Sequence, residues 1–144
     1  MYEGRVVGVS DGDSITVLDS AKRQHKVRLA GIDAPELKQA FGQASKRSLS
    51  ALVFGKTVAV GTEKRDRYNR QIGKVLVEGR DANLAQVEAG FAWHYKQYAA
   101  EQSAIDQILY GEAEADARSS HRGLWQDRNP QAPWEYRRQQ REFR

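Results

Sequence analysis

The sequence predicts an α+β protein built around a small five-stranded β-barrel with three α-helices. Segments rich in β-branched residues and separated by turn signals indicate strands over 5–9, 14–18, 24–30, 57–63 and 72–77. Apolar residues at helical spacing indicate helices over 39–53, 82–89 and about 99–119. A helix between the third and fourth of five strands is the element order of an OB-fold barrel.

Composition excludes several classes of protein. The chain has 144 residues, of which 40% are hydrophobic and 29% charged, as in an ordinary globular domain. It contains no cysteine, so a disulfide scaffold, a thiolate zinc site and a catalytic thiol are excluded. No stretch approaches the roughly 20 apolar residues that a membrane span needs, so no membrane partner is expected. The net charge of +4 is a mild bias toward polyanions.

Turn signals delimit the first three strands. Asp11-Gly12 is typical of a hairpin turn, and Asp19-Ser20 marks the next one. In the third strand Val27 and Leu29 alternate with Lys26 and Arg28, so the two pairs lie on opposite faces. The first three strands therefore form a meander.

Caps and apolar stripes delimit the helices. Asp81 is placed to cap the helix over 82–89, and Gly90 to end it. The longest helix carries one apolar face, formed by Ile105, Ile108, Leu109 and Ala113. Trp125 is expected to anchor the end of that helix in the core. The chain then turns polar, which divides it into a domain over 1–126 and a basic polar C-terminal tail over 127–144.

Three acidic residues flank the second and third strands and form a candidate metal site. The ends of these strands can meet in a small barrel, which would bring Asp13, Asp33 and Glu36 together. Two carboxylates and a main-chain carbonyl make a hard oxygen site that suits calcium or magnesium. Each acid alone also has a structural explanation, since Asp11-Gly12 is a turn and Asp33 before Ala34-Pro35 favours an Asx turn.

Two arginines and several aromatic residues could contact nucleic acid. Arg28 and Arg70 each carry a planar guanidinium that matches phosphate oxygens, although either could be a solvated surface arginine. Beside a metal and a carboxylate, they would suit phosphoryl transfer. Arg67 and Tyr68 adjoin Arg70. A second aromatic patch, Trp93, Tyr95 and Tyr98, could stack on bases or pack at a helix end.

The order of these motifs resembles the staphylococcal nuclease, or thermonuclease, family. The matching blocks span roughly residues 4–126 and are Ser10-Asp11-Gly12-Asp13-Ser14, Val27-Arg28-Leu29-Ala30-Gly31-Ile32-Asp33-Ala34-Pro35-Glu36, Asp66-Arg67-Tyr68-Asn69-Arg70, Asn83-Leu84 with Gly90, and Arg122-Gly123-Leu124-Trp125. One block would be weak support, whereas the combination in this order is highly specific.

The resemblance implies a calcium-dependent endonuclease on a five-stranded OB barrel with three helices. Such an enzyme hydrolyses DNA and RNA without sugar specificity at the 5′ P–O bond and leaves 3′-phosphates. It implies a monomer that favours single-stranded substrates. The roles that it assigns are calcium ligands at Asp13, Asp33 and the Ala34 carbonyl, water activation at Glu36, phosphate binding at Arg28 and Arg70, and nucleotide contacts at Arg67 and Tyr68.

The chain departs from the family pattern at three places. Ala34 stands where Thr is common, which removes a hydroxyl but keeps the carbonyl. Asn69 stands where the best-known member has Gly, and Asn tolerates positive φ. The loop between Glu36 and Gly42 is several residues shorter, and either Tyr95 or Tyr98 could match a later base-stacking tyrosine.

Two further expectations concern the class of function and the compartment. An alternative to the nuclease is a catalytically weak or inactive OB module that binds nucleic acid or a protein partner, but the five key charged residues are all present. Because the family is commonly exported and the chain lacks cysteine, we expect a secreted or periplasmic protein whose leader is absent from this chain, with the cytoplasm as the alternative.

Overall fold

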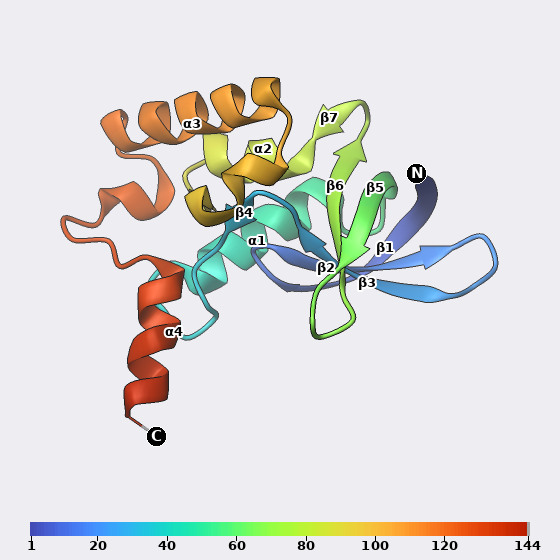
Figure 1. Ribbon diagram of the computed structural model, residues 1–144, viewed down its shortest axis with the longest axis horizontal. Helices are drawn as coiled ribbons and strands as arrows, with labels where there is room; N and C mark the ends of the chain where they lie inside the picture. Colours follow the sequence, from blue (N-terminus) through green and yellow to red (C-terminus); the bar gives the residue numbers. More distant parts are fainter. Residues whose placement is uncertain (144) are drawn as a thin grey trace.

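The computed structural model describes residues 1–143, with the side chains of Glu63 and Tyr98 excepted. Five strands form a closed barrel (Figure 1): β1 (Tyr2–Asp11), β2 (Ser14–Asp19), β3 (Gln24–Leu29), β5 (Thr57–Arg65) and β6 (Gln71–Val77). Adjacent strands follow the order β3-β2-β1-β5-β6, and a parallel pairing of β3 with β6 closes the barrel. The α+β fold class and the OB-type barrel are thus confirmed.

Alternating residues of the strands fill the barrel. Val17, Val27, Leu29, Val60 and Val75 are all fully or almost fully buried, whereas their neighbours along each strand point outward. The inward orientation of Val27 and Leu29 is the one that their alternation with Lys26 and Arg28 predicts. Because Arg28 lies on the other face, the barrel core and the candidate site share strand β3.

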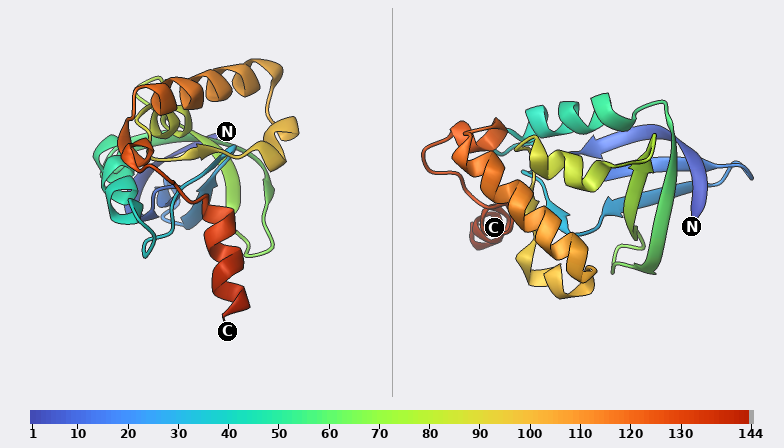
Figure 2. Two further views of the ribbon diagram at one scale, coloured as in Figure 1. Left: turned by 90° about the vertical axis from the view of Figure 1, so that its left-hand side faces the viewer. Right: turned by 90° about the horizontal axis from the view of Figure 1, so that it is seen from above.

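Helices cover one end and one side of the barrel (Figure 2): α1 (Gly42–Val53), α2 (Ala82–Glu88), α3 (Ala104–Ser119) and α4 (Pro133–Glu142). Short strands β4 (Ile32–Asp33), β7 (Arg80–Asp81) and β8 (Trp93–His94) complete the sheets, with β4 paired to β8. Two 3₁₀ turns lie over Lys96–Glu101 and Gly123–Gln126. None of the helices within residues 1–143 is both long and apolar enough to cross a membrane.

The helix boundaries follow local chain chemistry. The Asp81 carboxylate accepts the Leu84 N–H at 3.0 Å, which confirms the predicted cap of α2, and Gly90 ends that region with φ +80°. The first helix starts at Gly42 instead of residue 39. Phe41 has φ +67°, in the left-handed region, so the helix cannot extend through it.

The predicted apolar face of α3 does not pack on the core. Ile105 and Ile108 are 70% and 59% exposed, and Leu109 is also exposed, while only Ala113 reaches the core. The buried face instead contains Tyr110, whose hydroxyl donates to Asp81 at 2.7 Å. On this opposite face, Tyr110 binds Asp81, the cap of α2, and Glu114 accepts the N–H of His94 in β8, polar contacts that apolar spacing does not reveal.

The C-terminal segment packs against the body of the protein. Trp125 is buried with Leu124 and Ala117, as predicted for an anchor. Beyond it, residues 133–142 form α4, where the sequence predicted a polar tail and only three helices. Trp134 stacks on Tyr95, with ring centroids 5.4 Å apart, and meets Trp93 edge-on. In Figures 1 and 2, α4 stands beside the loop that precedes α1.

Asn83 links the barrel to the start of the candidate site. Its fully buried amide accepts the Val75 N–H at 3.1 Å and donates to the carbonyls of Ala30 and Gly73 at 3.0 Å. Ala30 follows β3 directly, so this amide fixes the chain that leads to Asp33.

Replacing Asn83 with Ala should lower the free energy of unfolding by about 2–4 kcal/mol, because three main-chain groups each lose a hydrogen bond to this fully buried side chain, although the Gly73 carbonyl still accepts from the Ala30 N–H. Urea denaturation measures this change, with the exposed Asn129→Ala variant as control. A loss no larger than that of the control would show that the Asn83 bonds do not hold the barrel.

Candidate active site

The polar cluster forms where the β1–β2 turn meets the end of β3. The Asp13 carbonyl accepts the Leu29 N–H at 2.8 Å, and the Asp13 carboxylate accepts the Ala34 N–H at the same distance. Asp13 is almost completely buried and Asp33 is 0% exposed. The structure therefore brings the two predicted carboxylates to one end of the barrel, as the meeting of the two strands requires.

Arg28 lies between these two carboxylates. Its Nη2 atom is 3.2 Å from Asp33 Oδ1 and 3.4 Å from Asp13 Oδ2. Its Nη1 atom donates to the carbonyls of Leu29 and Ile32, each at 2.9 Å. The side chain is only 16% exposed, so the alternative of a solvated surface arginine does not hold for Arg28. Arg28 is a buried counter-ion that also fixes the chain between β3 and β4.

The electrostatics of the cluster are those of several carboxylates held close together and largely buried. Burial, and then the nearby Asp13 carboxylate, raise the pKa of Asp11 to about 7. Burial also acts to raise the pKa of Asp13, but the Arg28 guanidinium and several hydrogen bonds outweigh it and leave that pKa below its usual value. Arg28 thus favours the ionised form of Asp13, whereas burial and the Asp13 charge disfavour ionisation of Asp11.

Glu36 stands at the edge of this cluster and reaches solvent. Its carboxylate is 35% exposed, and its Oε1 atom accepts a hydrogen bond from Arg137 Nη1 at 2.9 Å. The same guanidinium binds Asp33 through two bonds, Nη1 to Oδ1 at 3.1 Å and Nη2 to Oδ2 at 2.7 Å. Asp13, Arg28, Asp33 and Glu36 are therefore joined through hydrogen bonds and ion pairs.

Arg137 is the member of this cluster that sequence reasoning missed. It lies in the segment that was assigned to the tail. The signal that could have located it is Pro133, a residue favoured in the first turn of a helix, followed by Trp134 and Tyr136 in a run without Gly or Pro. Such a run predicts an amphipathic helix that packs through its aromatic residues.

Arg67, Tyr68 and Arg70 form a second group in the loop between β5 and β6. Asp66 organises this loop, because its carboxylate accepts the N–H groups of Tyr68 and Arg70 and the Arg70 Nε–H at 2.7–2.9 Å. Asn69 has φ +63°, the left-handed conformation that the sequence comparison anticipated. Tyr68 is 66% exposed, and the guanidinium groups of Arg67 and Arg70 lie 5.0 and 5.6 Å from its ring.

Strand pairing sets the separation of the two groups. The parallel register of β3 and β6 places Arg28 opposite Ile72, and Arg70 immediately precedes β6 at the end of the β5–β6 loop. In the structure Arg70 is paired with Asp66.

The two tyrosines considered as base-stacking candidates have different outcomes. Tyr95 stacks on Trp134, and the side chain of Tyr98 lies outside the described part of the chain.

The donor set fits a hard divalent cation. Asp13 and Asp33 supply carboxylate oxygens, and the Ala34 N–H donates to Asp13 Oδ2 at 2.8 Å, which fixes the chain at Ala34 beside that carboxylate. Within residues 1–143, no three acidic or imidazole side chains converge in a metal-ligand arrangement. In the structure both Asp33 oxygens accept from Arg137, and Arg28 also donates to Asp33 Oδ1.

Comparisons with known proteins agree with this chemistry. Residues 26–127 match the family model described as "Staphylococcal nuclease homologue". A Haemophilus influenzae protein described as an "Uncharacterized endonuclease" is 44% identical over 137 residues, which cover 95% of this chain and 74% of the relative.

Two further relatives extend the comparison. An Escherichia coli O157:H7 protein with the same description is 45% identical over 93% of this chain and 84% of its own length. The "Micrococcal nuclease" of Shigella flexneri is 38% identical over 95% of this chain and 81% of its own length. The barrel, the family match and these sequence identities agree, and they show that the chain belongs to the staphylococcal nuclease family.

Proposed function

We propose that this protein is a calcium-dependent endonuclease that hydrolyses the 5′ P–O bonds of DNA and RNA and leaves 3′-phosphate ends. Membership of a nuclease family supports hydrolysis of nucleic acid phosphodiesters. The observation that carries the finer proposal is the cluster in which Asp13, Asp33, Arg28 and Glu36 meet at one end of the barrel.

The side chains have complementary roles in this proposal. Asp13, Asp33 and the Ala34 carbonyl would hold calcium, which when bound supplies positive charge against the phosphate oxygens. Glu36, the most exposed acid of the four-residue cluster, accepts a proton from the attacking water. Arg28 and Arg70 bind phosphate oxygens as negative charge develops on them. Arg28 is already oriented by two carbonyls, so little ordering is required on binding.

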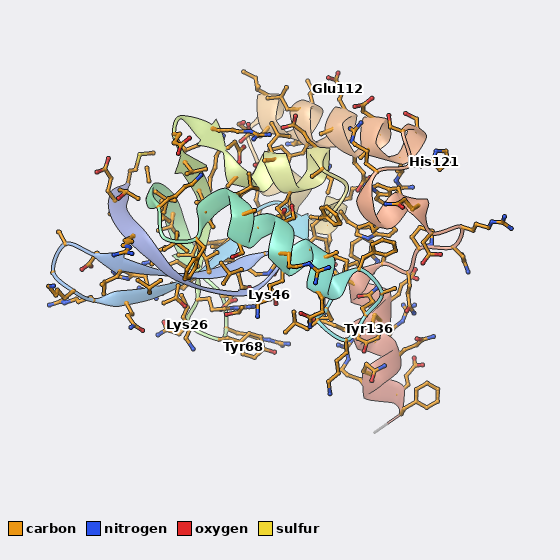
Figure 3. The ribbon with its side chains drawn as sticks, turned by 180° about the vertical axis from the view of Figure 1, so that it is seen from behind. Lys26, Lys46, Tyr68, Glu112, His121 and Tyr136 are labelled. Carbon is orange, nitrogen blue, oxygen red and sulfur yellow. The ribbon has the colours of Figure 1, made fainter. Side chains whose placement is uncertain are left out.

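The β5–β6 loop is suited to a single-stranded substrate. Tyr68 presents an exposed ring flanked by two guanidinium groups, an arrangement that can stack a base and bind its phosphate. Figure 3 shows Tyr68 and Lys26 on one side of the molecule and Glu112 and His121 on the opposite side. A duplex would hide the base faces from this ring, so we propose that the protein acts preferentially on single strands. We also propose that it acts as a monomer.

Replacing Tyr68 with Ala should weaken binding of single-stranded DNA about 5- to 100-fold, which corresponds to the loss of one stacked base. The exposure of the ring means that stability should change little. Fluorescence anisotropy with a short oligonucleotide measures the Kd, and Tyr68→Phe, which keeps the ring, is the matched control. Equal weakening in both variants would exclude stacking as the cause.

Cleavage of denatured DNA and of RNA by the purified chain tests the proposed function. We expect cleavage with calcium, much less with magnesium and none with a chelator. Products should be extendable by a polymerase only after a phosphatase has removed their 3′-phosphates. Products extendable without that treatment would contradict the assigned bond. Binding of nucleic acid without cleavage in either metal would favour the alternative, an inactive OB module.

A further inference from the structure

The C-terminal helix α4 delivers an arginine into the candidate active site. Arg137 touches two acids of the cluster, Asp33 through both guanidinium nitrogens and Glu36 through one. A guanidinium fork that spans two carboxylates fixes their relative orientation, because each N–H has a defined direction. Arg137 is 34% exposed, so its contacts are partly shielded from water.

A chain of hydrogen bonds connects the same helix to the main chain at Glu36. The Glu36 N–H donates to Gln39 Oε1 at 3.1 Å, and Gln39 Nε2 donates to the Gln131 carbonyl at 2.6 Å. The Gln131 side chain in turn donates to Gln139 Oε1, on α4, at 2.9 Å. Together with Arg137, these bonds form a closed ring that holds Glu36 at its main chain and at its carboxylate.

Aromatic packing keeps α4 in the position that this ring requires. Trp134 lies one turn before Arg137, stacks on Tyr95 and meets Trp93 edge-on. Trp93 is the pairing partner of Asp33 across β4 and β8. The helix is therefore seated on the strand pair that carries one of the carboxylates to which Arg137 binds.

We propose that Arg137 is a positioning residue that holds the Glu36 carboxylate beside Asp33, so that α4 is part of the active site. This inference rests on the proposed function. The loop after Glu36 is short, and in addition to its own turn bonds it is tied to the C-terminal segment through Gln39 and the Gln131 carbonyl. The guanidinium also offsets charge on Asp33, so its removal should favour a cation at that carboxylate.

The test uses Arg137→Gln, Arg137→Lys and Trp134→Ala in the full chain, with Arg138→Gln as the matched control on an exposed position of the same helix. Arg137→Gln should lower kcat about 10- to 100-fold with KM changed less than about threefold, since the loss concerns orientation and not binding. Arg137→Lys keeps the positive charge and should therefore recover part of the kcat that Arg137→Gln loses. The recovery should be incomplete, because one ammonium cannot bridge both acids. Trp134→Ala should reproduce the kcat loss, and Arg138→Gln should match the wild type.

A second readout does not depend on cleavage. Calorimetric titration with calcium alone should show binding about 3- to 10-fold tighter for Arg137→Gln than for the wild type, as expected when one screened neighbouring charge is removed. Unchanged calcium affinity would show that Arg137 does not hold Asp33 in solution.

The outcomes separate this inference from the proposed function. A wild-type chain that cleaves neither DNA nor RNA would overturn the proposed function. An active wild type with an equally active Arg137→Gln variant would overturn only the positioning role. A rise in kcat on removal of Arg137 would also overturn it, because the guanidinium would then be a blocking group.

Discussion

Replacing Glu36 with Gln will lower kcat about 10²- to 10⁴-fold while leaving the free energy of unfolding nearly unchanged. The amide oxygen of Gln can still accept the hydrogen bond from Arg137, so the geometry of the cluster is retained. What the substitution removes is the ability to take a proton from water. The side chains of Glu36 and Arg137 are each about one-third exposed, so their contact is partly solvated and little stability depends on the charge of Glu36.

The measurement is steady-state cleavage of denatured DNA together with urea denaturation of each variant. Glu112→Gln is the matched control, because Glu112 is exposed on α3, on the side of the molecule opposite Tyr68 (Figure 3). A Glu36→Gln variant that is folded and retains wild-type kcat would contradict water activation by this residue. A loss of equal size in the Glu112 variant would instead point to a general effect of charge on substrate binding.

Local patterns were sufficient to predict the strands of the barrel and the pairing of the first three. Val27 and Leu29 alternate with Lys26 and Arg28, and that alternation alone places Arg28 on the face of β3 that points away from the core. The turn signal at Asp11-Gly12 places Asp13 directly before β2, and the β2–β3 pairing then brings its carbonyl to the Leu29 N–H at the end of β3. These predictions succeeded because each depends on neighbours within a few residues or on the pairing of consecutive strands.

Contacts between distant segments could not be predicted in the same way. Arg137 and Asp33 are far apart in the sequence, and their pairing requires that α4 is seated on Trp93 and Tyr95. The exposed apolar face of α3 has a similar cause. Tyr110 is buried because its hydroxyl reaches Asp81, a polar contact that a count of apolar residues does not detect.

The second large effect concerns Arg28. Replacing Arg28 with Ala will abolish measurable cleavage and will also lower the free energy of unfolding by about 3–5 kcal/mol, as found when one partner of a buried ion pair is removed. Stability is affected as well as turnover, because the Arg28 side chain lies between Asp13 and Asp33 and also satisfies two main-chain carbonyls.

Three variants distinguish the two contributions of Arg28. Arg28→Lys keeps a positive charge beside Asp13 and Asp33 but lacks the planar fork, so it should recover part of the stability and little of the activity. Arg5→Ala, which removes an exposed arginine from β1, should change neither quantity. Urea denaturation and cleavage rates measured on the same preparations give both values. If Arg28→Ala were as stable as Arg5→Ala, the acids would not need a guanidinium between them in the folded protein, and Arg28 would act on the substrate alone.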